Sequence, residues 1–211
     1  MRHVQPSRDT TRLGAGSTVI AALALLGCAA LPTPVWATAP QERVRSLVAA
    51  VSAVLEDPAL RGAGKKQERR TQVATIIHDA FDFESMARDA LGAPWTTLTP
   101  EQQAEFTRLF GDRFEQSYSL LVLRFLGERT TSYVGESIDG NRATVRTFLV
   151  SEKDGTLPVD YRLAARDDRW TVVDVVVDGV SLAGNYRAQF GKIIRTSSYE
   201  TLLRRMRRSV E

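Results

Sequence analysis

The chain has 211 residues, with 28 Lys or Arg against 25 Asp or Glu, and a formal net charge of +3. Residues 1–39 hold three Arg and one Asp, so the rest of the chain is nearly balanced and does not resemble a basic nucleic-acid-binding protein. Cys28 is the only cysteine, which excludes an intramolecular disulfide. The fold must therefore depend on its hydrophobic core, and a chain of this length can bury roughly 70% of the surface exposed when unfolded.

Residues 1–39 are expected to be a signal peptide that is removed on export. Three arginines precede an apolar run from Val19 to Leu31, which is too short to span a bilayer and has the length of a signal-peptide core. Small residues near Ala37 and Ala39 offer cleavage sites, so we expect a soluble, exported protein of residues 40–211. A lipoprotein anchored through Cys28 is the alternative, because Leu25-Leu26-Gly27-Cys28 resembles a lipoprotein box.

The first half of the exported chain has helical spacing. Apolar residues recur at i, i+3, i+4 and i+7, which is typical of amphipathic helices. Asp82 and Gly92 can begin and end one of them, and Thr99-Pro100-Glu101-Gln102 has the sequence of a capping box. These patterns predict helices over residues 41–57, 65–80, 83–91 and 99–126.

The second half has the alternation of strands, with Asp-Gly pairs at two of the turns. The strand from Trp170 to Val177 is apolar almost throughout, so both of its faces should be covered. Ser181 is expected to cap the helix that follows, and Asp174 to pair with a cation such as Arg187. The patterns predict strands over residues 130–138, 142–150, 157–166 and 169–177, then helices over 182–194 and 197–208.

This order of elements predicts one α+β domain over residues 40–211. Helices should pack on one side of a four-stranded antiparallel sheet and enclose an apolar pocket. A row of Phe residues at four-residue spacing on the long fourth helix can form ordinary core or the wall of a ligand site.

A run of spaced residues after position 160 resembles the MlaC-type family of periplasmic phospholipid-binding proteins, also known as toluene-tolerance auxiliary proteins. The residues that carry the resemblance are Tyr161, Trp170, Asp174, Gly179-Val180-Ser181-Leu182, Asn185-Tyr186-Arg187 and Gln189-Phe190. A weaker resemblance extends upstream through Phe81-Asp82, Met86-Ala87, Leu91-Gly92 and Trp95. The resemblance implies that the acyl tails of a lipid lie inside the protein.

We find no set of residues that would support catalysis. Outside residues 1–39, His78 is the only histidine, and the chain lacks Cys/His metal spacing and the usual nucleophile or nucleotide motifs. Asp174 and Asp178 would lie about 13 Å apart on a strand, which is too far for paired carboxylate chemistry. We therefore expect neither an enzyme, nor a metal site, nor a cofactor.

The expected lipid-binding residues face one another between the inner side of the sheet and the helices. Each of them taken alone is more often ordinary core than cavity wall, and the resemblance is what favours a pocket. They are Val145, Leu149, Tyr161, Leu163, Val173 and Val175 from the sheet, and Phe106, Phe110, Phe114, Tyr118, Leu182 and Tyr186 from the helices.

The resemblance implies a monomeric carrier that moves phospholipid between an outer-membrane lipoprotein–porin complex and an inner-membrane ABC transporter complex with MCE domains. Hopanoid or another polycyclic lipid is an alternative cargo, since the family has hopanoid-associated members. An interaction adaptor of the same fold without a ligand is a second alternative. Four arginines between Arg204 and Arg208 mark a solvated helix end or a surface for an acidic partner or anionic lipid.

Overall fold

The computed structural model describes residues 39–127 and 129–208, and the side chains of these residues except residue 63 and residues 119–127. Residues 1–38 of the expected signal peptide, with Cys28 among them, lie outside the described residues. The helices are α1 (Pro40–Glu56), α2 (Lys66–Ala80), α3 (Phe83–Leu91), α4 (Pro100–Gly127), α5 (Leu182–Thr196) and α6 (Tyr199–Arg208), with short 3-10 turns at Pro58–Leu60, Ala63–Lys65 and Ala93–Thr97. The strands are β1 (Thr130–Asp139), β2 (Arg142–Ser151), β3 (Gly155–Arg166), β4 (Arg169–Val177) and β5 (Val180–Ser181).

The strands form one antiparallel sheet in the order of the sequence. The α+β class is confirmed, with one difference, because the described sheet has a fifth strand that the sequence did not indicate. Asp178 and Gly179 adopt positive φ values of 50° and 78°, so the chain turns back and pairs Val180 with Val177. A strand of two residues is too short to show alternation, which is why only four strands were expected.

Capping side chains begin three of the helices as the sequence predicted, with Asp82 as the N-cap of α3. At α4 the amide of Gln102 donates to Thr99 Oγ1 at 3.3 Å, and the amide of Thr99 donates to Gln102 Oε1 at 2.9 Å. This reciprocal pair is the expected capping box. At α5 the amide of Gly184 donates to Ser181 Oγ at 2.9 Å, so Ser181 is the expected N-cap.

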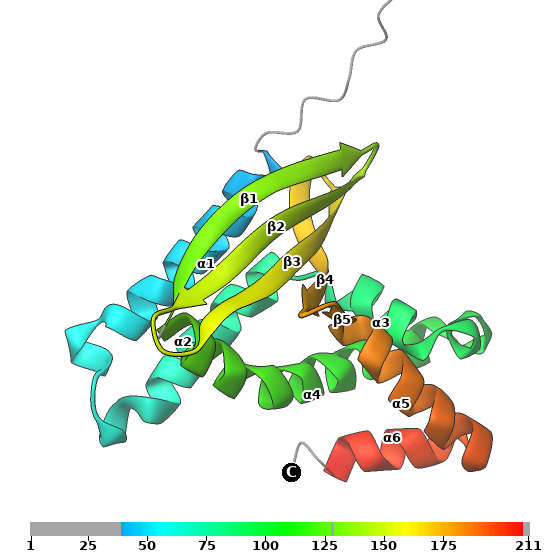
Figure 1. Cartoon of the computed structure of the whole chain (residues 1–211). Helices are drawn as coiled ribbons and strands as arrows, with labels where there is room; N and C mark the ends of the chain where they lie inside the picture. Colours follow the sequence, from blue (N-terminus) through cyan, green and yellow to red (C-terminus); the bar gives the residue numbers. More distant parts are fainter. Residues whose placement is uncertain (1–38, 128, 209–211) are drawn as a thin grey trace, which may run out of the picture. The chain divides into compact units, whose positions relative to one another are not determined.

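The helices lie on one side of the sheet, with α1 and α2 behind the long strands in Figure 1 and α4 beneath them. Helices α3, α5 and α6 gather beyond the lower ends of β4 and β5. Along β2, exposed and buried side chains alternate from Arg142 to Val150, because only one face meets the helices. By contrast, β4 is buried on both faces from Trp170 to Val176, as expected.

Both edges of the sheet are interrupted, at β1 on one side and at β4, beyond the reach of the short β5, on the other. In β1 the register shifts between Tyr133 and Gly135, which leaves an extra residue and a local bulge; Gly135 has a φ of 152°. Beside the first half of β4, Phe81 forms a parallel bridge with Val172, and the amide of Asp82 donates to the Val172 carbonyl at 2.8 Å. The junction between α2 and α3 therefore covers the part of β4 that β5 does not reach.

Candidate functional site

An apolar cavity of about 370 Å³ lies between the inner face of the sheet and the helices. Helices α1, α2 and α4 form one side, strands β2 to β4 form the other, and β5 with the first turn of α5 lies at one end. Its lining residues are Leu47, Val48, Val51, Ile77, Phe81, Phe114, Tyr118, Leu149, Leu157, Val159, Tyr161, Val175, Val177, Val180, Leu182 and Asn185.

The described residues of the lining include no charged side chain. Asn185 and the hydroxyls of Tyr118 and Tyr161 supply its side-chain polar atoms. Burial raises the pKa of Tyr161 far above its ordinary value, so the phenol is neutral at any physiological pH. A site of this kind can hold an apolar molecule, but its lining offers no acid, base or nucleophile for a reaction.

The described residues also contain no group of three or more His, Cys, Asp or Glu that could hold a metal ion. The side chain of His78 is about half exposed, and its Nε2 lies 3.6 Å from Glu115 Oε2. His78 is therefore a boundary residue of α2 that faces a carboxylate of α4.

The structure brings half of the expected lipid-binding residues together around the cavity. They come from five different elements, so their meeting depends on the fold rather than on sequence spacing. These residues are Phe114 and Tyr118 of α4, Leu149 of β2, Tyr161 of β3, Val175 of β4 and Leu182 of α5.

Three of the other expected residues belong to a packed aromatic cluster. The rings of Phe110 and Tyr186 lie 5.2 Å apart, and the ring of Phe106 lies 5.8 Å from that of Phe190, both in edge-to-face orientation. Trp95 packs against Phe106 at 6.3 Å and extends the cluster to the turn before α4. Phe106, Phe110 and Tyr186 are therefore interior residues that join α4 to α5.

The remaining three expected residues lie on the sheet away from the cavity. Val145 and Leu163 point inward but are fully buried in the core. Val173 does not share the inner face, because the pairing of β3 with β4 shifts between Arg162 and Leu163 and leaves Val173 as the extra residue of a bulge. It lines a separate, polar hollow of about 520 Å³ together with Arg162, Asp174 and other residues.

Most of the cavity residues that we did not name from the sequence carried a usable signal. Val159 and Val177 lie two residues from Tyr161 and Val175, so simple alternation places them on the same face. Leu47, Val48 and Val51 lie on the apolar face of α1. Phe81 continues the apolar face of Ile77 and Ala80 just beyond the end of α2, and it belongs to a pair that carries the family resemblance.

Asp174 connects β4 to the start of α5 and so fixes one end of the cavity. Its carboxylate accepts hydrogen bonds from the Ser181 hydroxyl at 2.6 Å and the Ala183 amide at 3.1 Å, and pairs with Arg162 at 3.1 Å. The expectation that Arg187 would be its partner is wrong, since Arg162 lies directly opposite on β3. The Arg187 side chain lies against Gly92 instead, where a Cβ atom on residue 92 would come within 3.1 Å of the Arg187 Nε.

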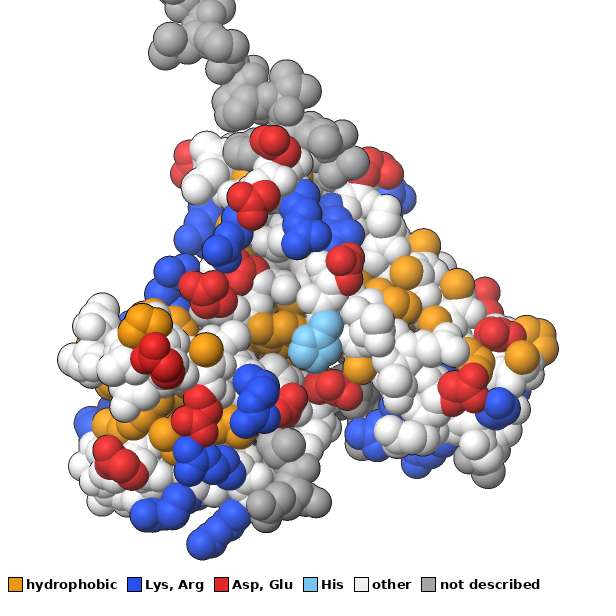
Figure 2. Space-filling view, turned by 180° about the vertical axis from the view of Figure 1, so that it is seen from behind, with side chains coloured by type: hydrophobic (Ala, Val, Ile, Leu, Met, Phe, Trp, Pro, Cys, Tyr) orange, Lys and Arg blue, Asp and Glu red, His pale blue; other side chains and the backbone are white. Residues whose placement is uncertain are grey.

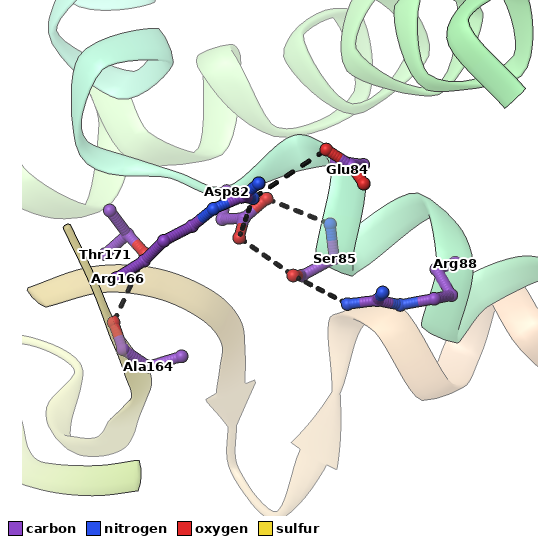
Figure 3. A network of polar contacts seen from close by, with 7 residues as sticks. All are labelled: Asp82, Glu84, Ser85, Arg88, Ala164, Arg166 and Thr171. Atoms are coloured by element: carbon purple, nitrogen blue, oxygen red, sulfur yellow. Dashed lines mark hydrogen bonds and ion pairs between the residues drawn. The ribbon is translucent and has the colours of Figure 1, made fainter. Parts of the chain in front are cut away.

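Figure 3 shows the polar network around Asp82, the residue that follows Phe81 of the cavity wall. Asp82 accepts from the Ser85 amide at 3.0 Å and the Ser85 hydroxyl at 2.8 Å, and Arg166 of β3 lies 3.4 Å away. Burial opposes ionisation of Asp82, but the Ser85 hydrogen bonds and the Arg166 charge outweigh it and hold the pKa of Asp82 below its ordinary value. The network thus joins α3 to the sheet next to the cavity.

No helix in the described part of the chain is long and apolar enough to cross a membrane.

The family model described as MlaC protein matches residues 45–208. A solved structure of a phospholipid-binding protein from Ralstonia solanacearum, in complex with a phospholipid, has the same fold, with a TM-score of 0.70 and 23% identity over 81% of this chain and 96% of that chain.

Two curated relatives agree with the family model. Toluene tolerance protein ttg2D of Pseudomonas putida is 29% identical over 116 residues, and the match spans 54% of each chain, about half the length of that relative. The intermembrane phospholipid transport system binding protein MlaC of Haemophilus influenzae is 22% identical over 145 residues, 66% of this chain and 67% of that protein. The family model covers most of the chain, including every described residue that lines the cavity. The chain therefore belongs to the MlaC family.

Proposed function

We propose that this protein is a periplasmic carrier that binds a phospholipid with its acyl chains in the cavity between helices and sheet. The observation that supports the proposal most directly is a cavity whose lining is apolar and uncharged. Such a lining replaces the hydrocarbon interior of a bilayer, and Tyr118, Tyr161 and Asn185 are the only polar side chains among its described residues.

The energetics of lipid transfer explain why a carrier of this kind is needed. A phospholipid with two chains exposes around 30 methylene groups to water, each costing about 0.8 kcal/mol, so crossing water alone costs on the order of 20 kcal/mol. A dry cavity removes most of that cost without any chemical step. The carrier therefore needs walls of the right shape and no catalytic group.

The residues that we propose to contact the acyl chains are the expected residues that line the cavity, together with the additional α1 and β-strand residues around them. The expected ones are Phe114, Tyr118, Leu149, Tyr161, Val175 and Leu182. We propose that Phe106, Phe110, Val145, Leu163 and Tyr186 support these walls from behind.

The names of the relatives support phospholipid as the cargo. The Haemophilus influenzae relative is named for an intermembrane phospholipid transport system, and the Ralstonia solanacearum structure contains a phospholipid. On this basis we propose that the protein exchanges lipid with an inner-membrane ABC transporter complex containing MCE domains and with an outer-membrane lipoprotein–porin complex.

Native mass spectrometry of protein purified without detergent tests the carrier function. We expect a stoichiometric adduct that organic solvent extracts as phospholipid. An adduct that extracts as a hopanoid would support the carrier function but identify a different cargo. A bare protein mass that stays unchanged after incubation with phospholipid vesicles would contradict the proposal and favour an adaptor without a ligand.

A further inference from the structure

Helices α5 and α6 carry a concentrated positive charge. Residues 182–208 contain seven Lys or Arg and one Glu, a net charge of +6. Residues 40–181 contain 18 Lys or Arg and 22 Asp or Glu, a net charge of −4. The near-neutral total therefore hides two regions of opposite sign, and the last two helices form the basic one.

Most of these cations have no carboxylate partner among the described residues. Arg207 is the exception, with its Nε 3.0 Å from Glu105 Oε1 on α4. Arg204 donates to the neutral Thr201 hydroxyl at 2.9 Å and helps to lower the pKa of the nearby Glu200, but no ion pair within 4.0 Å joins it to a described carboxylate. Within the described part of the chain, no ion pair within 4.0 Å involves Lys192, Arg205 or Arg208.

The cations point to solvent because the opposite side of each helix is already used in the core. On α6, Leu202 and Met206 are buried, whereas Arg204, Arg205 and Arg208 are exposed. On α5 the buried residues are Ala183, Tyr186 and Phe190, and the exposed cations are Arg187, Lys192 and Arg195. Figure 2 shows Lys and Arg side chains along the lower edge of the molecule as seen from behind.

This basic face, defined as the exposed cations of α5 and α6, contains no apolar anchor. The large hydrophobic side chains that are exposed in the described residues belong to β1, β2 and β5, and none belongs to α5 or α6. Stable protein interfaces usually bury aromatic or aliphatic anchors in shaped pockets. A flat array of arginines without anchors instead matches a surface of many equivalent anionic groups.

The cavity opens next to this face. Val180 lines the cavity and is 57% exposed, so the cavity reaches solvent at the turn between β5 and α5. Leu182 and Asn185, in the first turn of α5, also line it. Arg187 follows within the next turn, so contact made through α5 would bring the cavity opening close to the bound surface.

We propose that the basic face is a docking surface for anionic lipid bilayers. The inference rests on the proposed function, because a lipid carrier must approach a lipid surface to load or unload. Each Lys or Arg near an anionic membrane contributes roughly 1 kcal/mol to binding at ordinary ionic strength. Salt weakens this attraction, since the Debye length shortens from about 10 Å at 0.1 M to about 3 Å at 1 M.

Sedimentation of the purified protein with vesicles tests the docking surface. We expect binding to vesicles that contain phosphatidylglycerol, weak binding to vesicles of phosphatidylcholine alone, and loss of binding as salt is raised. The variant with Arg204→Gln, Arg205→Gln and Arg208→Gln should bind the anionic vesicles about 100-fold more weakly, if three cations act roughly additively. All three side chains are exposed, so its thermal unfolding midpoint should match the wild type.

A matched control removes the same net charge elsewhere. Lys66, Arg146 and Lys153 are exposed and lie on α2, β2 and the β2–β3 turn, so a triple Gln variant at these positions should bind within a few-fold of wild type. Equal losses in both variants would overturn the proposal, and so would unchanged binding of the α6 variant. A wild-type protein that binds neither vesicle would also overturn it and would point to an acidic protein partner.

The lipid content of the same samples separates this inference from the proposed function. If the protein carries lipid but does not bind anionic vesicles, the proposed docking surface alone is contradicted. Lipid-free protein that binds those vesicles through α6 would contradict the carrier function while leaving the membrane contact established.

Discussion

Two apolar regions meet along α4 and differ in how they are filled. Around the first half of the helix, Phe106 and Phe110 pack against Phe190 and Tyr186 of α5. The ring centroids lie 5.8 Å and 5.2 Å apart in these two pairs. Around the second half, the same helical stripe continues as Phe114 and Tyr118, but these side chains face a cavity. One stripe of aromatic residues therefore serves as solid core at one end and as a wall at the other.

The difference lies in the size of the facing side chains. The first half of the stripe faces aromatic rings that are long enough to fill the space between helices. The second half meets aromatic rings on one side, where Phe81 and Phe83 pack against Phe114, and faces mainly aliphatic side chains of the sheet and of α1 across the cavity. Protein interiors are normally packed to the density of organic crystals, so short residues on both sides of a wide gap leave a hollow. Hydrophobicity alone does not separate a wall from a core.

The largest loss of stability is expected from a substitution in the packed half of the aromatic stripe on α4. Replacing Phe106 with Ala should lower the free energy of unfolding by about 3–5 kcal/mol, because the cavity created is surrounded by rings that cannot collapse into it. Replacing Phe114 with Ala should cost less, since part of that ring faces the cavity, and its remaining contacts are with Phe81, Phe83 and its neighbours on α4. Urea denaturation of lipid-free protein measures both, and equal losses would show that the two halves are packed alike.

A pair of leucines on the inner face of the sheet sharpens the comparison. Leu163→Trp overpacks the core and should lower the free energy of unfolding by about 1–3 kcal/mol while bound lipid is retained. Leu149 lines the cavity, so Leu149→Trp should fill it and reduce the lipid-to-protein ratio with a smaller loss of stability. Native mass spectrometry and thermal unfolding give the two readouts. The opposite assignment of effects would place the ligand elsewhere.

A smaller effect is expected at the polar network around Asp82. Asp82→Ala removes the N-cap of α3 and should cost about 1 kcal/mol at neutral pH. Because the folded pKa of Asp82 is lowered, its contribution is complete above the unfolded pKa of about 3.9 and is lost as pH falls through the folded value. The difference between wild type and variant in denaturant melts should therefore shrink below about pH 4.

A neighbouring carboxylate provides the control for that pH dependence. Glu84 lies 3.7 Å from Arg166 but is largely exposed, so Glu84→Ala should change the free energy of unfolding by less than about 0.5 kcal/mol. A variant at Asp82 whose deficit persists unchanged into acid would show that its carboxylate charge contributes nothing to the network.

The sequence predicted the helices and long strands closely, because their signals are local. The capping box before α4 and the Ser181 cap are properties of three or four adjacent residues, and both form as expected. Alternation along β3 placed Tyr161 correctly on the inner face. The same reasoning failed at Val173, where one extra residue in β4 changes the alternation without any mark in a run of valines.

The extent of the cavity depended on information that lies far apart in the chain. Nothing in the spacing of Phe106, Phe110 and Phe114 states where α5 stops covering α4. That boundary depends on which residues of α5 and of the sheet face each position, and on how wide the gap is. The family resemblance suggested a pocket, but only the packed structure separates its walls from the residues behind them.

The interrupted edges of the sheet bear on how the protein behaves at high concentration. An unbroken row of free backbone groups on an outer strand recruits strands of other molecules, which is a first step to aggregation. The bulge in β1 breaks such a row at Gly135. Phe81 and Asp82 pair with Val172 on the backbone edge of β4 that β5 does not reach. The folded protein should therefore resist association through its strands, and under the proposed carrier function more of its copies would stay available for transport.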